Sequence, residues 1–207
     1  MARLEDAPVG SSVKGIECVI GSNSHEQENK GCIYFVRHGE TVWNVENKIC
    51  GVTDVPLTEL GHQQAIETGY KILKEGIKAD LILYSPLIRA AETAGHISEI
   101  TGIPMRVEPR LIEQHFGKWE STPRNGIEFK LAKESFVCSN DGGETHLLVA
   151  QRVYNLLDEL KGNPNKTHIL VAHNGIARVV QSYFHDMTNA EYAAFGVKNC
   201  AVVRFDF

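Results

Sequence analysis

The chain has 207 residues, 43% of them hydrophobic and 23% charged, and it carries a formal net charge of −5. This composition is typical of one water-soluble domain, and no apolar run reaches the roughly 20 residues that a membrane span needs. The acidic balance argues against nucleic acid or an acidic membrane as the main partner, because both need a broad basic face. The N-terminus lacks the apolar core of a secretory signal, so we expect a cytoplasmic protein.

The five cysteines are scattered along the chain and include no Cys-x-x-Cys pair. This pattern predicts reduced thiols rather than disulfides or a metal centre. The stretch "HEQEN" (25–29) begins like a zinc protease motif, but Asn29 stands where the second histidine would be needed. The chain also lacks the glycine-rich loops that bind nucleotides and dinucleotides. We therefore predict no metal and no nucleotide cofactor.

Residues 1–30 are mostly polar and have the composition of turns and loops, as in "GSNSHEQENKG" (21–31). We expect an N-terminal extension there, partly irregular, with one short strand near "ECVI" (17–20). The pattern changes at Cys32, where apolar runs begin. Residues 31–207 are therefore predicted to form the folded domain.

From Cys32 onwards, apolar runs of strand length alternate with segments of helical spacing. In chain order we predict the strand 32–36, a helix 58–75, the strand 81–84, a helix opened by Ser85 and Pro86, a helix 145–160, the strand 168–172, and a helix over 176–184. Such alternation predicts an α/β fold with a mostly parallel central sheet covered by helices on both faces. Residues 201–207 are expected to close the sheet as an antiparallel edge strand.

Three predicted strands end in residues that suit an anion. The first ends in Arg37-His38-Gly39, the second leads to Arg89 one turn into its helix, and the third ends in His173-Asn174-Gly175. Ligands of open α/β sheets bind beyond the carboxyl ends of the strands, where helix N-termini favour negative charge. Arginine adds planar, permanently charged donors that match phosphate oxygens. The three strand ends together predict a phosphate site.

The same stretches form an ordered set, "RHGETVWN", "GVTDVPLTELG", "SPLIRAAETA", "LIEQHFGKWE", "GGET" and "VAHNGIAR", that runs from about residue 31 to residue 207. In this order the set resembles the histidine phosphatase superfamily, the phosphoglycerate-mutase-like enzymes. The resemblance implies a phosphoglycerate-mutase-like fold and transfer of a phosphoryl group through a phosphohistidine.

The resemblance also implies a role for each matching residue. His38 would be the nucleophile and Glu113 the proton donor. The phosphoryl oxygens and the substrate would be held by Arg37, Arg89, His173, Asn44, Cys50, Gly51, and the backbone around Asn174 and Gly175. Cys50 departs from the family pattern, which usually has Ser or Thr before this glycine.

The chemistry of these residue types agrees with those roles. Phosphoryl transfer relies on positioning and fixed positive charge, and it needs a neutral imidazole whose second nitrogen is held by a hydrogen bond. The sequence does not name the partner of that nitrogen. A carboxylic acid protonates the leaving oxygen and then activates water. Glu113 is our candidate and Glu120 the alternative, while His115 is a further candidate for the pocket wall.

The reaction that follows phosphorylation of His38 has alternatives. The segment between Gly117 and Gly142 has only about two dozen residues, where the cofactor-dependent mutases resemble one another in a longer insertion with basic contacts to the substrate carboxylate. We therefore favour a phosphatase for a small phosphorylated metabolite, needing no cofactor. The alternatives are a phosphoglycerate mutase primed by 2,3-bisphosphoglycerate, and a protein phosphatase or phosphate-binding pseudoenzyme. The sequence permits a homo-oligomer without indicating one.

Overall fold

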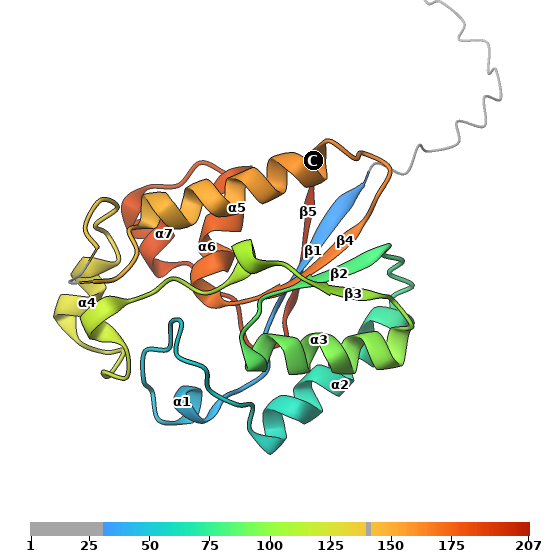
Figure 1. Ribbon diagram of the computed structural model, residues 1–207, viewed down its shortest axis with the longest axis horizontal. Helices are drawn as coiled ribbons and strands as arrows, with labels where there is room; N and C mark the ends of the chain where they lie inside the picture. The colour runs from blue at the N-terminus through green and yellow to red at the C-terminus, as the bar shows by residue number, and fades with distance from the viewer. Residues whose placement is uncertain (1–30, 140–141) are drawn as a thin grey trace, which may run out of the picture.

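The computed structural model describes residues 31–139 and 142–207 (Figure 1). A five-stranded sheet with the order β3-β2-β4-β1-β5 forms its centre. The strands are β1 (Cys32–Arg37), β2 (Leu81–Tyr84), β3 (Met105–Val107), β4 (His168–Ala172) and β5 (Val202–Asp206). The predicted N-terminal extension and its short strand lie outside the described residues.

The pairing of the strands confirms the predicted mixed sheet. β4 pairs in parallel with β1 on one side and with β2 on the other, and β2 pairs in parallel with β3. β5 is antiparallel to β1, with Phe205 opposite Ile33, and forms the edge. The sequence prediction omitted β3, which has only three residues and is partly exposed, so that no apolar run marks it.

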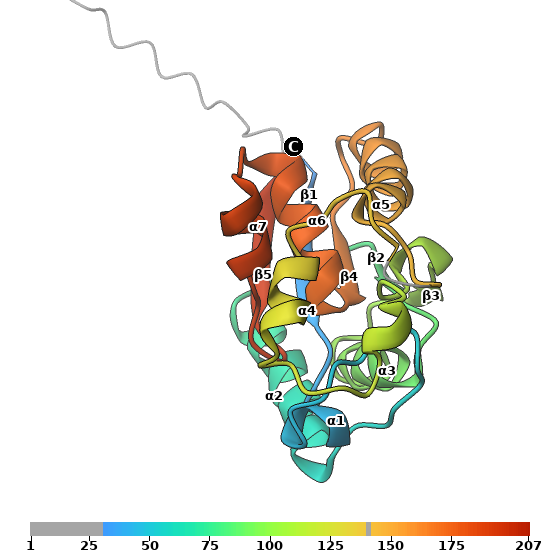
Figure 2. The same ribbon diagram turned by 90° about the vertical axis from the view of Figure 1, so that its left-hand side faces the viewer.

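Helices cover both faces of the sheet, as predicted (Figures 1 and 2). α2 (Glu59–Lys74) and α3 (Ile88–Thr101) lie on one face, while α5 (His146–Lys161) and α6 (Asn174–Phe184) lie on the other. The short elements are α1 (Val42–Val45), α4 (Ile127–Ala132), α7 (Asn189–Ala194) and the 3₁₀ turns η1 (Pro109–Leu111) and η2 (Gly117–Trp119). Within the described ranges, every helix is too short or too polar to cross a lipid bilayer.

Side chains that alternate along the strands form two hydrophobic cores, one on each face of the sheet. Phe35 and Leu170 face α5 and α6, whereas Val36 and Ile169 face α2 and α3. Side chains of a strand point alternately to the two faces, so β1 and β4 need apolar residues at nearly every position. This requirement explains the continuous apolar runs in the sequence.

The register of the central strands brings their carboxyl ends to one edge. The N–H of His38 donates to the carbonyl of Ala172 at 3.0 Å, and the N–H of Ser85 donates to the carbonyl of Val171 at 3.0 Å. The residues that follow β1, β2 and β4 therefore start from neighbouring points. α4 lies on the same side of the molecule (Figures 1 and 2).

Candidate active site

His38 follows β1 directly and is 5% exposed. Its Nδ1 lies 2.7 Å from the carbonyl oxygen of Gly39. A carbonyl oxygen only accepts hydrogen bonds, so Nδ1 carries the proton and Nε2 has the free lone pair. Burial and the charges of Arg89 and Arg37 hold the pKa of His38 well below 6.5. His38 is therefore a neutral imidazole with one nucleophilic nitrogen, and its hydrogen-bond partner is its own neighbour in the chain.

Gly39 is required by the close approach of two backbone segments. A Cβ at this position would lie 2.4 Å from the carbonyl oxygen of Gly61 in α2. Such a distance is far below van der Waals contact, so any larger residue would push the end of β1 away from α2. The glycine of Arg37-His38-Gly39 thus fixes where the imidazole stands.

His173 lies beside His38, with 5.1 Å between the ring centroids, and has no exposed surface. Its Nδ1 accepts a hydrogen bond from Nε of Arg89 at 3.2 Å, because a guanidinium only donates. Its Nε2 therefore carries the proton, and Ser85 Oγ accepts it at 2.7 Å. Burial and the Arg89 charge lower the pKa of His173 well below 6.5. Both histidines of the site are neutral.

Arg89 is fully buried in the first turn of α3 and holds the loop that follows α1. Its Nη2 donates to the carbonyl of Gly51 at 2.7 Å, and its Nη1 donates to the carbonyl of Thr53 at 2.9 Å. Arg89 and His173 lie behind the cavity wall, whereas His38 lines the cavity. In this arrangement Arg89 ties the loop to the second histidine.

Arg37 is the last residue of β1 and lines the same cavity as His38. Its Nη1 donates to the carbonyl of Val197 at 2.7 Å, while its buried Nε has no hydrogen-bond partner among the described residues. Burial, together with the charge of Arg124, lowers the pKa of Arg37 to about 10. The guanidinium therefore stays charged at neutral pH, and its Nε–H is available to donate a hydrogen bond to an anion.

Glu113 belongs to the segment after η1, and its side chain reaches the N-terminal end of α6. The residue is 3% exposed. Its Oε2 accepts the N–H of Gly175 at 3.0 Å, and its Oε1 accepts the N–H of Gln114 at 2.9 Å. The carboxylate therefore occupies the positive end of the α6 dipole. A Cβ at position 175 would lie 2.3 Å from Oε1, so only glycine leaves room for this contact. Glu113 thus lines the cavity with a fixed orientation.

Glu120, the alternative candidate for the proton donor, bonds the loop around Val52 and Thr53 instead of facing the cavity. Its carboxylate accepts the N–H groups of Val52 and Thr53 at 2.9 and 3.1 Å, the N–H of Phe116 at 3.3 Å, and the hydroxyl of Thr53. Burial raises its pKa, but these hydrogen bonds outweigh burial and leave the pKa lowered. Glu120 clamps the loop after Gly51 and lies outside the residues that line the cavity.

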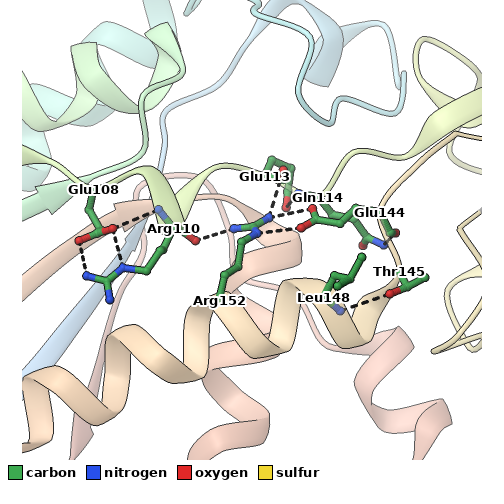
Figure 3. Close-up of polar contacts among 8 residues, drawn as sticks. All are labelled: Glu108, Arg110, Glu113, Gln114, Glu144, Thr145, Leu148 and Arg152. Carbon is green, nitrogen blue, oxygen red and sulfur yellow. Dashed lines mark hydrogen bonds and ion pairs between the residues drawn. The ribbon is translucent and has the colours of Figure 1, made fainter.

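Arg152 of α5 holds the segment that carries Glu113 (Figure 3). Its Nε and Nη2 donate to the two carboxylate oxygens of Glu144 at 2.9 and 3.0 Å. Its Nη1 donates to the carbonyl of Arg110, and Nη2 also contacts the carbonyl of Glu113 at 3.4 Å. One guanidinium thereby joins the backbone on both sides of Leu111 to the loop before α5.

The amide residues on the cavity side complete the polar frame. Asn44 lines the cavity, and its Oδ1 accepts the N–H of Thr41 at 3.0 Å. Asn199 donates from Nδ2 to the carbonyl of His38 at 2.9 Å and to Asn44 Oδ1 at 3.3 Å. Asn174 also lines the cavity, and its Oδ1 accepts the N–H of Val197 at 2.8 Å. Asn199 lies in none of the strand-end motifs, so no sequence pattern could single it out.

Cys50 lines the cavity as a protonated thiol. Burial is the main cause that raises its pKa to about 11, so the thiol is neutral at physiological pH. Its Sγ is 3.6 Å from the carbonyl of Thr53. Gly51 behind it is buried, and a Cβ there would lie 2.2 Å from Glu120 Oε1. No two cysteines of the described residues form a disulfide.

The structure adds three cations to the predicted set. Arg124, Lys133 and Arg178 line the cavity that contains His38. Arg178 is the last residue of "VAHNGIAR" and lies one turn beyond Asn174 on α6. The helical spacing from Asn174 is therefore the signal that could have identified it. Arg124 and Lys133 come from the segment after η2, where no periodicity predicts which side chains face inward. His115, by contrast, bonds the carbonyl of Gly142 at 2.9 Å and does not line this cavity.

Residues 31–139 and 142–207 contain no group of three or more acidic, histidine or cysteine side chains placed to hold a metal ion. The cavity contains one imidazole, one carboxylate and several guanidinium groups. This donor set suits an anion with several oxygens.

The comparison with protein families agrees with this geometry. The model of the histidine phosphatase superfamily, branch 1, matches residues 33–207. The chain belongs to the histidine phosphatase superfamily. The resemblance seen in the ordered motifs is therefore confirmed, and so is the fold class that it implied.

Curated relatives and solved structures of this superfamily fall on both sides of the mutase and phosphatase division. A probable phosphoglycerate mutase of Yersinia pestis is 30% identical over 183 residues, 84% of each chain. The mycobacterial glucosyl-3-phosphoglycerate phosphatase complexed with VO3 has 30% identity and a TM-score of 0.74 over 84% of this chain and 92% of its own. Phosphoserine phosphatase from Entamoeba histolytica, in complex with 3-phosphoglyceric acid, has 30% identity and a TM-score of 0.73 over 86% of this chain and 91% of its own. The protein is an enzyme of this type.

Proposed function

We propose that the protein is a phosphomonoesterase that works without a metal, through a phosphohistidine on His38, on a small phosphorylated metabolite. The observation that carries this proposal is the state of His38. Its Nδ1 proton is held by the Gly39 carbonyl at 2.7 Å, so Nε2 is free to attack while the imidazole stays neutral.

The proposed reaction has two steps. Nε2 of His38 attacks phosphorus, the bond from phosphorus to the leaving oxygen breaks, and Glu113, which enters this step as the protonated carboxylic acid, gives that oxygen its proton and becomes a carboxylate. Water then attacks the phosphohistidine, Glu113 takes the proton of the water, and the bond from Nε2 to phosphorus breaks. Arg37 has an unused buried Nε donor for the phosphoryl oxygens. In the same proposal Arg89 and His173 act from behind the cavity wall: Arg89 holds the loop at Gly51 and Thr53, and His173 lies against His38.

The first experiment measures turnover and the covalent intermediate together. We expect His38→Ala to abolish release of phosphate from aryl phosphates and to lose the acid-labile phosphoprotein seen after rapid quenching. His185→Ala removes an exposed histidine and serves as the control. Turnover by His38→Ala protein that equals the control would rule out His38 as nucleophile. Absence of both turnover and phosphoprotein in the unmodified enzyme would favour the phosphate-binding pseudoenzyme.

A phosphoglycerate mutase is the second candidate, because the relative from Yersinia pestis bears that name. The reaction would need 2,3-bisphosphoglycerate to place the first phosphoryl group on His38. Incubation with 3-phosphoglycerate, with and without the bisphosphate, separates the two candidates. Formation of 2-phosphoglycerate only with the bisphosphate identifies a mutase, whereas free phosphate without the isomer identifies a phosphatase.

A further inference from the structure

The segment that leads into β5 holds the end of β1 at three points. The N–H of Cys200 donates to the carbonyl of Arg37 at 2.9 Å. Nδ2 of Asn199 donates to the carbonyl of His38 at 2.9 Å. The carbonyl of Val197 accepts Nη1 of Arg37 at 2.7 Å. The support that β5 gives to β1 therefore continues beyond the paired strands, to the residues that carry the proposed chemistry.

The peptide unit between His38 and Gly39 is held at both of its polar ends. Nδ2 of Asn199 bonds its carbonyl oxygen at 2.9 Å, and Oγ1 of Thr93 in α3 accepts its N–H at 3.0 Å. Two hydrogen bonds on one planar unit restrict its rotation. The next carbonyl, that of Gly39, accepts the proton of His38 Nδ1. Asn199 therefore helps to fix the backbone from which both the imidazole and its hydrogen-bond acceptor project.

The same nitrogen of Asn199 also determines which way the amide of Asn44 points. Oδ1 of Asn44 accepts from Nδ2 of Asn199 at 3.3 Å and from the N–H of Thr41 at 3.0 Å. Both neighbours are donors, and an amide oxygen has two lone pairs to receive them. The oxygen of Asn44 is therefore turned towards Asn199 and the backbone. Its Nδ2 remains to donate into the cavity that Asn44 lines.

Asn199 makes both contacts because a primary amide nitrogen carries two hydrogens. One hydrogen goes to the carbonyl of His38 and the other to Oδ1 of Asn44. A serine or threonine hydroxyl has one hydrogen for the two acceptors, and an aspartate carboxylate has none. The pair of contacts thus depends on the amide group and not only on a side chain of this size.

We propose that Asn199 is a positioning residue for phosphoryl transfer, which fixes the backbone of His38 and aims the Nδ2 donor of Asn44 at the phosphoryl oxygens. The inference rests on the proposed function, in which the phosphoryl group lies beside Nε2 of His38. Asn199 is not among the residues that line the cavity, so it acts through these two neighbours. One side chain thereby sets the distance between a nucleophile after β1 and a donor on α1.

Two substitutions separate positioning from a role in the turn. Asn199→Asp keeps the shape of the side chain but places a carboxylate against two acceptor oxygens, whereas Asn199→Ala only removes the donor. We expect kcat on aryl phosphates to fall by about ten- to a hundred-fold in Asn199→Ala, as misplacement of a reacting group does, and further in Asn199→Asp. A residue that only shapes the turn would give the reverse order, because asparagine and aspartate favour turns alike.

Binding of inorganic phosphate tests the contact with Asn44 without any need for turnover. Dissociation constants are measured by calorimetry for the unmodified protein, Asn199→Ala, Asn44→Ala and the double variant. We expect Asn199→Ala to weaken binding by about three- to ten-fold, and to have almost no further effect once Asn44 has been replaced. Lys198→Ala alters an exposed neighbour in the same segment and should leave both phosphate binding and kcat unchanged.

Thermal denaturation shows whether each variant is folded. Should Asn199→Ala unfold, Asn199→Ser takes its place, because a single hydroxyl hydrogen restores at most one of the two contacts. The expected order is then the same, with Asn199→Asp the least active of the variants.

The outcomes separate this inference from the proposed function. Equal weakening of phosphate binding by Asn199→Ala with and without Asn44, or an aspartate variant more active than the alanine variant, would overturn the positioning role. Absence of the phosphoprotein in the separate quench experiment would overturn the phosphatase while leaving the binding result valid. A weakening that appears only while Asn44 is present supports the link between the two amides in either case.

Discussion

The proposed nucleophile, His38, depends on a contact between neighbouring residues. Nδ1 of His38 bonds the carbonyl of Gly39, so the tautomer follows from the local backbone and needs no distant carboxylate. In histidines generally, the protonated nitrogen is set by its hydrogen bond, often to a carboxylate or to a backbone carbonyl. In His38 the local backbone of Arg37-His38-Gly39 sets the tautomer, while the fold sets the position of the ring and the charges around it.

Substitution of Glu113 tests the proposed acid. Glu113→Gln retains an oxygen that can accept one of the two backbone N–H bonds but has no proton to give. We expect turnover of alkyl phosphates to fall by about 10²- to 10⁴-fold, with a smaller loss on activated aryl phosphates whose leaving group needs no proton. Steady-state kinetics on both substrates measures the difference. Equal losses on the two would argue that Glu113 only supports the structure.

The buried histidine also makes stability depend on pH. The pKa of His38 in the fold lies well below 6.5, because of burial and the charges of Arg89 and Arg37. Below about pH 6.5 the unfolded chain binds a proton at this histidine that the folded protein does not bind. The free energy of unfolding therefore decreases as the pH is lowered. We expect the unmodified protein to lose up to about 1.4 kcal/mol more than His38→Asn between about pH 7.5 and 5.5 in urea denaturation.

The exposed residue His185 provides the control for that measurement. His185→Asn should show the same loss as the unmodified protein over the same pH range. An identical pH dependence for His38→Asn would mean that the imidazole of His38 takes up its proton in the folded state as readily as in the unfolded chain.

At the residue scale, the sequence located the residues that follow predicted strands. Arg37, His38 and His173 could be placed because the end of a parallel strand fixes where the next side chains stand. Arg124 and Lys133 could not be placed, since their orientation depends on loop conformation and on bonds to carbonyls of Lys48 and Ala193. No local sequence pattern predicts either of these two hydrogen bonds.

At the element scale, the segment with Glu113 has little regular structure and depends on α5. Arg152 bonds its backbone at two carbonyls and is itself oriented by Glu144 (Figure 3). A helix of sixteen residues thus serves as the rigid support for the loop that carries Glu113. The contact between α5 and the loop fixes the position of the loop and takes no part in the proposed reaction.

The conservative variant Arg152→Lys tests this support. A lysine cannot bond both oxygens of Glu144 and two carbonyls at once, because it lacks the planar fork of arginine. We expect kcat on alkyl phosphates to fall by about ten- to a hundred-fold, as misplacement of a catalytic group does, with little change in KM. Lys161→Ala, at the far end of α5, is the matched control. A loss confined to thermal stability would contradict a positioning role.

The long elements were predictable, and the short ones were not. Helices α2 and α5 have apolar spacing over sixteen residues each and begin at the threonine caps Thr58 and Thr145. β3, α4 and α7 have between three and six residues, too few for a period to emerge. α4 matters most among these omissions, since Phe129 on it and Lys133 at its end line the cavity.

At the scale of the whole molecule, a net charge of −5 coexists with a cavity lined by Arg37, Arg124, Lys133 and Arg178. The local field attracts an anionic substrate although the average surface repels it. We expect kcat/KM to fall several-fold between about 0.05 and 0.5 M salt, because screening acts on the attraction. Stopped assays across that range measure the slope, and the Arg124→Gln variant should flatten it. A slope equal in both proteins would place the attraction elsewhere.

The cavity cations Arg124, Lys133 and Arg178 also bear on how long the protein persists in a cell. An anion that binds among them compensates positive charge that has no carboxylate within 4.0 Å among the described residues, and it therefore stabilises the folded state over the unfolded one. Proteases act on the opened chain, so degradation slows as the folded state gains stability. The lifetime of the enzyme would then rise and fall with the supply of its own substrate.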